Sequence, residues 1–261
     1  MTLTHFPEGE ERKVQITSTA SIDGTPVAYI VVLAAVTTAL AFIPFTIVLA
    51  SGGGMPLSQS IFPLLGWILG PFAGALASGI GTLIGTFLAP YTAGIPIFSV
   101  WGAMLGSFTA GMMVLGYRRK YWWIALTIFF AFELFLYANH AFHNGVNPKI
   151  IIAGSFVDWS GLLLYALPTR TLFTRWISSQ KIIPLITGLF LGTWTVWGVI
   201  HLSLTAITYY IFNWPEEIWI ALIPIIPVEN LIRCLAGTVI GAGVISGLRE
   251  INLVKPREAI Y

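Results

Sequence analysis

Residues 59–89 read QSIFPLLGWILGPFAGALASGIGTLIGTFLA, an apolar run that is interrupted by Gly70-Pro71. Proline lacks a backbone N–H and disfavours helical geometry in the residue before it. The run is therefore expected to form two short helices, 59–70 and 72–89, rather than one long helix. The division matters for the topology, because it determines whether the chain contains seven or eight apolar helices.

The whole chain is too apolar for a water-soluble protein. Of its 261 residues, 56% are hydrophobic and 9% are charged, whereas soluble domains carry roughly 25% charged residues. A mean hydropathy of +0.84 indicates that many apolar residues face lipid. A net charge of +2, spread along the chain, argues against a basic face that binds nucleic acid. We therefore expect an integral membrane protein without a large soluble domain.

Glycine, proline, asparagine and charged clusters divide the chain into apolar segments. Together with 59–70 and 72–89, the segments are 27–50, 96–116, 121–140, 150–168, 182–212 and 218–248. This pattern predicts an all-α, polytopic transmembrane helix bundle of about eight spans. The bundle forms one domain, 27–250, between a polar N-terminal tail, 1–26, and a short C-terminal tail, 251–261.

The positions of Lys and Arg support eight helices independently, because these residues accumulate in short cytoplasmic loops. With a cytoplasmic N-terminus, eight spans place 11 of the 13 basic residues inside: Arg12, Lys13, Arg118, Arg119, Lys120, Arg170, Arg175, Lys181, Arg249, Lys255 and Arg257. Lys149 falls in an outer loop and Arg233 within the last span. Seven spans would put 118–120 and the C-terminal cluster on opposite sides. We therefore expect a cell-membrane protein with both termini cytoplasmic.

Several motifs occur in a fixed order along the chain. They are Ala35-Val36-Thr37-Thr38-Ala39, the loop Ser51-Gly52-Gly53-Gly54-Met55-Pro56, the LGP-x-x-GA pattern at 69–75, and Pro227-Val228-Glu229-Asn230-Leu231-Ile232-Arg233 before a glycine-rich helix that closes with Arg249. Over about residues 27–118 and 182–249, this order resembles the substrate-binding S component of the energy-coupling factor (ECF) vitamin transporters.

The resemblance implies a six-helix core that captures a vitamin or similar small molecule in an outward cavity capped by the first loop. It also implies that Ala35 and Ala39 face a transmembrane scaffold subunit, since small residues at i and i+4 let another helix approach closely. ATPase subunits of the ECF module would drive uptake, and the whole bundle would topple to release the ligand inside. Residues 119–180 depart from the family as an apparent insertion of two helices.

Polar residues within the apolar segments are the candidates for a substrate site, because charged groups at membrane depth are expensive. Glu229 and Arg233 share one helix face at i and i+4 and are expected to pair. The pair is either purely structural or polarises a pocket. The sidedness above places six candidates at one depth: Gln59, Trp101, His201, Thr205, Glu229 and Asn230. Trp101 also suits an interfacial belt, and His201 a simple hydrogen bond to a neighbour.

No catalytic pattern is present, and no enzyme activity is expected. The sequence lacks a Walker lysine motif, GxSxG and HExxH, so partners must supply any energy for transport. Neither a cofactor nor a metal is predicted: Cys234 is the single cysteine, and His140 and His143 lack a third ligand. The acids Glu133 and Asp158 lie in the inserted helices, where they either pair with polar neighbours or serve a proton relay.

The leading hypothesis is therefore a substrate-capture component of an ATP-driven uptake system, in contact with lipid, its ligand and an ECF module. The alternative is an accessory or structural subunit that docks into a larger membrane complex, such as one that contains pigments. A third hypothesis is an intramembrane enzyme that uses Glu133 or Asp158. A bound small molecule in purified protein distinguishes the first from the others.

Overall fold

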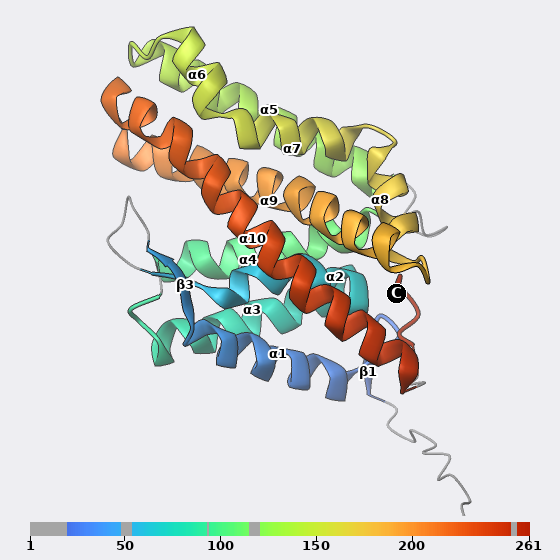
Figure 1. Ribbon diagram of the computed structural model, residues 1–261. Helices are drawn as coiled ribbons and strands as arrows, with labels where there is room; N and C mark the ends of the chain where they lie inside the picture. Colours follow the sequence, from blue (N-terminus) through green and yellow to red (C-terminus); the bar gives the residue numbers. More distant parts are fainter. Residues whose placement is uncertain (1–19, 48–53, 93, 115–120, 252–254) are drawn as a thin grey trace, which may run out of the picture.

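The computed structural model describes residues 20–47, 54–92, 94–114, 121–251 and 255–261 (Figure 1). Its helices are α1 (Val27–Ala41), α2 (Phe62–Leu69), α3 (Pro71–Leu88), α4 (Pro96–Met112), α5 (Trp122–His143), α6 (Pro148–Gly154), α7 (Phe156–Ala166), α8 (Thr169–Ile177), α9 (Ile182–Phe212) and α10 (Glu216–Glu250), with a 3-10 turn, η1 (Leu57–Ile61). Two short antiparallel pairs join β1 (Ser21–Ile22) to β2 (Thr25–Pro26) and β3 (Pro44–Ile47) to β4 (Gly54–Pro56). The predicted helical bundle is confirmed.

The long helices α9 and α10 run through the middle of the bundle (Figure 1). Helices α1 to α4 lie on one side of them, and α5 to α7 lie on the other. Among the described residues, α3, α5, α9 and α10 are long and apolar enough to cross a membrane. The bent pair α6 and α7 adds a fifth candidate, whereas α1 and the η1–α2 segment are shorter. Helix length therefore supports a membrane protein but does not by itself give eight spans.

The break at Gly70-Pro71 lies where the sequence predicts it. Helix α2 ends at Leu69, α3 begins at Pro71, and Gly70 has a φ of +85°, which favours glycine. Gly66 of α2 permits a close approach of α4, because a Cβ added at Gly66 would lie 2.0 Å from the carbonyl oxygen of Ser107 in α4. Small residues at such contacts let membrane helices approach one another.

The first predicted segment, 27–50, is too long. Helix α1 ends at Ala41, and the chain then enters β3 at Pro44, which cannot continue the helix. Side chains from the α3–α4 connection satisfy carbonyls at the helix end: Thr92 Oγ1 donates to Ala41 O at 2.7 Å, and Tyr91 OH donates to Phe42 O at 2.8 Å. Residues 48–50 lie outside the described part of the chain.

The region 150–168 is also not the single helix that the sequence predicts. It forms α6 and α7, which meet at 64° around Ser155. Helix α8, which follows, was not predicted at all, because it is amphipathic rather than apolar. Its inward residues are Arg170, Phe173, Thr174 and Ile177, the spacing of one helical face. Arg170 also donates to the carbonyls of Ala166 and Leu167 at 3.1 and 2.9 Å, closing the end of α7.

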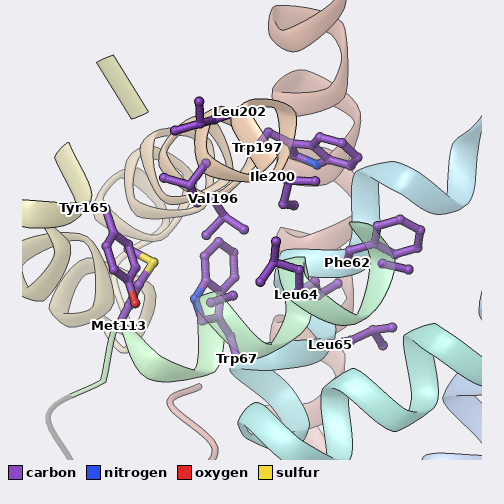
Figure 2. Packing of buried hydrophobic residues seen from close by; sticks show 14 of the residues in the cluster. Phe62, Leu64, Leu65, Trp67, Met113, Tyr165, Val196, Trp197, Ile200 and Leu202 are labelled. Carbon is purple, nitrogen blue, oxygen red and sulfur yellow. The ribbon is translucent and has the colours of Figure 1, made fainter. Parts of the chain in front are cut away.

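The predicted segments 182–212 and 218–248 correspond to α9 and α10, and α9 matches to the residue. All eight residues of α2 are buried. Figure 2 shows Phe62, Leu64 and Trp67 of α2 packed beside Trp197 and Ile200 of α9. The short helix α2 is therefore the centre of the core rather than a lipid-facing element.

The bundle has two distinct ends. At the first, here called the basic end, Arg249 donates to the carbonyls of Ile177 and Ser179, both at 2.9 Å, and the tail returns so that Ile260 N donates to Trp67 O at 3.0 Å. Six of the cations that the sequence assigns to the cytoplasm lie on α8, at the end of α10 or nearby: Arg170, Arg175, Lys181, Arg249, Lys255 and Arg257. The other five, Arg12, Lys13, Arg118, Arg119 and Lys120, lie outside the described residues.

The opposite end, here called the hairpin end, carries the β3–β4 pair, α6 and the turn between α9 and α10 (Figure 1). Gly54 N donates to Tyr91 O at 3.2 Å, and Asn147 N donates to Glu216 Oε2 at 2.7 Å, so polar contacts tie these segments to their neighbours. Residues 54–56 of the predicted first loop form β4 and lie at this end (Figure 1).

Candidate functional site: a cavity at the hairpin end

A cavity of about 520 Å³, here called the main cavity, opens between η1, α3, α4, α9 and α10. This volume suits a small organic ligand. Aromatic side chains form much of its wall: Phe62, Phe98, Trp197, Phe212 and Trp214. Its polar side chains include Gln59, Thr82, Ser99, His201, Thr208 and Arg233. A mostly apolar wall with a few polar groups is the usual design of a small-molecule site.

Arg233 of α10 is buried and held from several directions. Its Nε donates to Gln59 Oε1 at 3.1 Å and its Nη2 to Met55 Sδ at 2.7 Å. The guanidinium carbon lies 4.7 Å from the ring centroid of Trp197, a cation–π contact. Trp197 Nε1 in turn donates to Gln59 O at 3.1 Å. These bonds fix η1 against α9 and α10, so one polar wall of the cavity is pre-organised.

Glu229 and Arg233 pair on α10 as predicted, with Arg233 Nη2 3.7 Å from Glu229 Oε2. That distance is longer than the 2.7–2.9 Å typical of a charge-assisted hydrogen bond. The two side chains also face different spaces. Arg233 lines the main cavity, whereas Glu229 lines a smaller one beside it.

His201 of α9 connects the core with the inserted helices. Its Nδ1 lies 2.6 Å from Oδ1 of Asp158 in α7, and Asp158 is fully buried. The second carboxylate oxygen, Oδ2, has no hydrogen-bond partner within the described ranges. A carboxylate bonded to one ring nitrogen fixes the orientation of an imidazole, and Thr205 Oγ1 lies 3.5 Å from the other nitrogen, Nε2. Asp158 therefore holds His201 in place from behind.

The smaller space, here called the side cavity, has a volume of about 120 Å³. It meets the main cavity at His201 and Trp214, which line both. The inserted helices contribute Tyr137 and Gly154 to its wall. The ring of Tyr137 stacks on Trp219 at 5.0 Å. The insertion thus shapes the space directly behind His201.

The six predicted site residues fall into three places. Gln59 and His201 line the main cavity, and Thr205 and Glu229 line the side cavity. Trp101 and Asn230 line neither. Trp101 Nε1 donates to Ser203 Oγ at 3.3 Å, and Asn230 is buried with both amide atoms unpartnered among the described residues.

Sequence reasoning missed several groups at this site. It paired Arg233 with Glu229 and expected the pair to be either structural or to polarise a pocket, but it did not place Arg233 among the six candidates. It also did not single out Phe62 or Trp197. Periodicity gives no signal for them, because aromatic residues are frequent in every span. It expected Glu133 and Asp158 either to pair with polar neighbours or to serve a proton relay, but it named no neighbour. In the structure, Glu133 Oε1 accepts from Ser203 Oγ at 2.9 Å.

The two alanines expected to dock a partner lie on the outside of the bundle. Ala35 and Ala39 are exposed, whereas Ala34 and Thr37 of the same helix pack against Gly81 of α3. A Cβ at Gly81 would lie 2.5 Å from Ala34 O, so the inner face of α1 is tightly packed. The outer face leaves room for another helix to approach.

Cys234 is buried, as expected for a small apolar residue. Within the described ranges, no three His, Cys, Asp or Glu side chains gather as metal ligands. His140, in the last turn of α5, bonds through Nε2 to Asn213 Oδ1 at 2.7 Å and stacks on Tyr210 at 4.1 Å.

Comparisons of this chain with protein-family models, with curated proteins and with solved structures find no match. The fold and the site together define a class, a helical bundle of membrane type with an internal cavity near one end.

Proposed function

We propose that this chain is a membrane-embedded capture component for a small organic molecule, namely the substrate-binding S component of an ECF-type ATP-driven uptake transporter. The observation that carries the proposal is the main cavity, which combines about 520 Å³ of volume with aromatic walls, the buried Arg233 and the half-buried His201. A merely structural bundle gains nothing from such a cavity, because voids cost packing energy.

The sidedness of the bundle supports capture from outside. In chain order, α1, η1–α2, α3, α4, α5, the α6–α7 pair, α9 and α10 supply the eight passes of the proposed topology. Basic residues gather at one end, and positively charged ends of membrane proteins face the cytoplasm. The main cavity lies toward the hairpin end, so in this topology it opens outward beneath the first loop.

The outer face of α1 is available for a partner helix to dock within the membrane. Ala35 and Ala39 are exposed there, and close helix approach across small residues is a common membrane interface. The inserted helices α5 to α7 cover the opposite side of the bundle (Figure 1). They therefore leave this face open to the transmembrane scaffold of an ECF module, whose ATPase subunits would supply the energy.

Extraction of the purified protein tests the proposal. Protein isolated in mild detergent is washed free of loosely bound compounds, denatured, and its small-molecule fraction analysed by mass spectrometry against an empty-membrane control. The expected result is one organic molecule at close to one equivalent per chain. An empty extract, together with stoichiometric co-purification of an unrelated membrane complex, would instead favour an accessory or structural subunit.

A further inference from the structure

The charged residues around the main cavity are arranged asymmetrically. Both basic side chains, Arg233 and His201, line it, but the carboxylates that pair with them do not. Glu229 lines the side cavity, and Asp158 is fully buried and lines neither space. Among the described residues, the main cavity has no Asp or Glu in its wall. The cavity thus presents hydrogen-bond donors to its contents and keeps the negative charges behind them.

Arg233 retains donors and positive charge for a ligand. A guanidinium has five N–H donors, of which Gln59 Oε1 and Met55 Sδ take two. Glu229 lies 3.7 Å away, so it compensates the charge without forming a close hydrogen bond. An oxygen-rich anion is the natural partner for the remaining donors, because arginine binds such groups through two parallel hydrogen bonds.

The apolar wall adds a second requirement. Phe62 and Trp197 lie with ring centroids 6.1 Å apart and planes at 27°, while Phe212 and Trp214 are 6.1 Å apart and nearly parallel at 6°. Flat aromatic surfaces favour a flat ring in the ligand, since stacked rings interact more favourably than a ring and a flexible chain. Trp197 also contacts the guanidinium of Arg233, which places the ring surface beside the charge.

We infer that the main cavity takes a planar organic acid, whose acidic group accepts hydrogen bonds from Arg233 and lies against His201. The inference rests on the proposed function, because it assumes that the cavity is a capture site. It adds the chemical class of the captured molecule.

Two measurements test the inference on the intact chain in detergent. The first determines the ionisable groups of the molecule recovered by extraction. The second measures the affinity of ligand-depleted protein, by titration calorimetry, for three probes with one ring system: indole-3-acetate, indole-3-acetamide and tryptamine. We expect an acid in the extract. We expect indole-3-acetate to bind at least about tenfold more tightly than the amide or the amine, the effect of one hydrogen bond to a charged group.

Three variants separate a charge effect from a folding effect. Glu229→Gln leaves Arg233 without its compensating carboxylate and should tighten indole-3-acetate binding severalfold, a gain that a damaged fold cannot produce. The double variant Glu229→Gln/Arg233→Gln removes both charges together and should reduce the acid-to-amide preference to less than about threefold. Arg249→Gln removes an arginine of the same helix at the basic end and should leave the preference unchanged.

The outcomes distinguish the inference from the proposal beneath it. A neutral or cationic molecule in the extract, or equal or tighter binding of the amide or the amine, overturns the planar-acid inference and leaves the capture function standing. An empty extract with no binding of any probe overturns the capture function, and the inference with it. An acid in the extract together with a preference for indole-3-acetate that the double variant abolishes supports both.

Discussion

The contact between Asp158 and His201 should be among the strongest single polar interactions in this bundle. The two atoms are 2.6 Å apart, Asp158 is fully buried, and the contact joins α7 of the insertion to α9 of the core. Hydrogen bonds to charged groups are worth about 1.5–3 kcal/mol, whereas double-mutant cycles on membrane-protein hydrogen bonds average about 0.6 kcal/mol. The fully buried carboxylate places this pair in the higher range.

A double-mutant cycle measures that interaction. Asp158→Asn, His201→Gln and the double variant are unfolded reversibly in mixed micelles, and the coupling is the non-additive part of the unfolding free energies. We expect a coupling of about 1.5–3 kcal/mol. The matched comparison is the contact between Glu133 and Ser203, 2.9 Å long, which also joins a helix of the insertion, α5, to α9 of the core. Its coupling is measured with Glu133→Gln, Ser203→Ala and the double variant. A coupling for Asp158–His201 no larger than for Glu133–Ser203 would refute the argument.

Three other predictions follow from the packing and the charges. Replacing both Ala35 and Ala39 with Leu should abolish uptake or complex assembly in cells while leaving ligand binding by the purified chain within about threefold; loss of binding would place this face inside the bundle instead. Gly66→Ala should lower the free energy of unfolding by about 3 kcal/mol, the upper range for overpacking, because the added Cβ would meet a backbone oxygen at 2.0 Å. The control Gly243→Ala should have little effect, because a Cβ there has nothing within 4 Å. A cysteine introduced at Arg175 should react with a membrane-impermeant reagent only in permeabilised cells, and labelling of sealed cells would contradict the assigned topology.

Helix boundaries that depend on a few neighbouring residues were predictable from the sequence. The break at Gly70-Pro71 follows from proline geometry, and α9 follows from an uninterrupted apolar run, so both lie where expected. Helix α8 was missed because its apolar residues occupy one face and leave the average hydropathy low. The hairpin of β3 and β4 was missed because residues 42–47 are apolar enough to extend a span, and Pro44 was not weighed as a stop.

The candidate site was predictable in part, for a similar reason. Gln59 and His201 reach the main cavity because equal depth in the membrane is a fair guide to proximity. Depth does not determine which buried side chains reach a cavity, and so it could not separate Arg233, which lines the main cavity, from Asn230, which is equally buried but does not. The pairing of Asp158 with His201 joins residues 43 positions apart, and no spacing rule connects them.

Native mass spectrometry of the purified chain tests most directly whether the main cavity holds a captured molecule. We compare the unaltered protein with Ser99→Phe, which fills the cavity from α4, and with Thr187→Phe, a control on α9 outside the cavity that adds the same ring. Capture in the main cavity predicts one bound organic molecule on the unaltered protein and on Thr187→Phe, and none on Ser99→Phe. Equal occupancy of all three proteins, or no bound molecule on any, would contradict it.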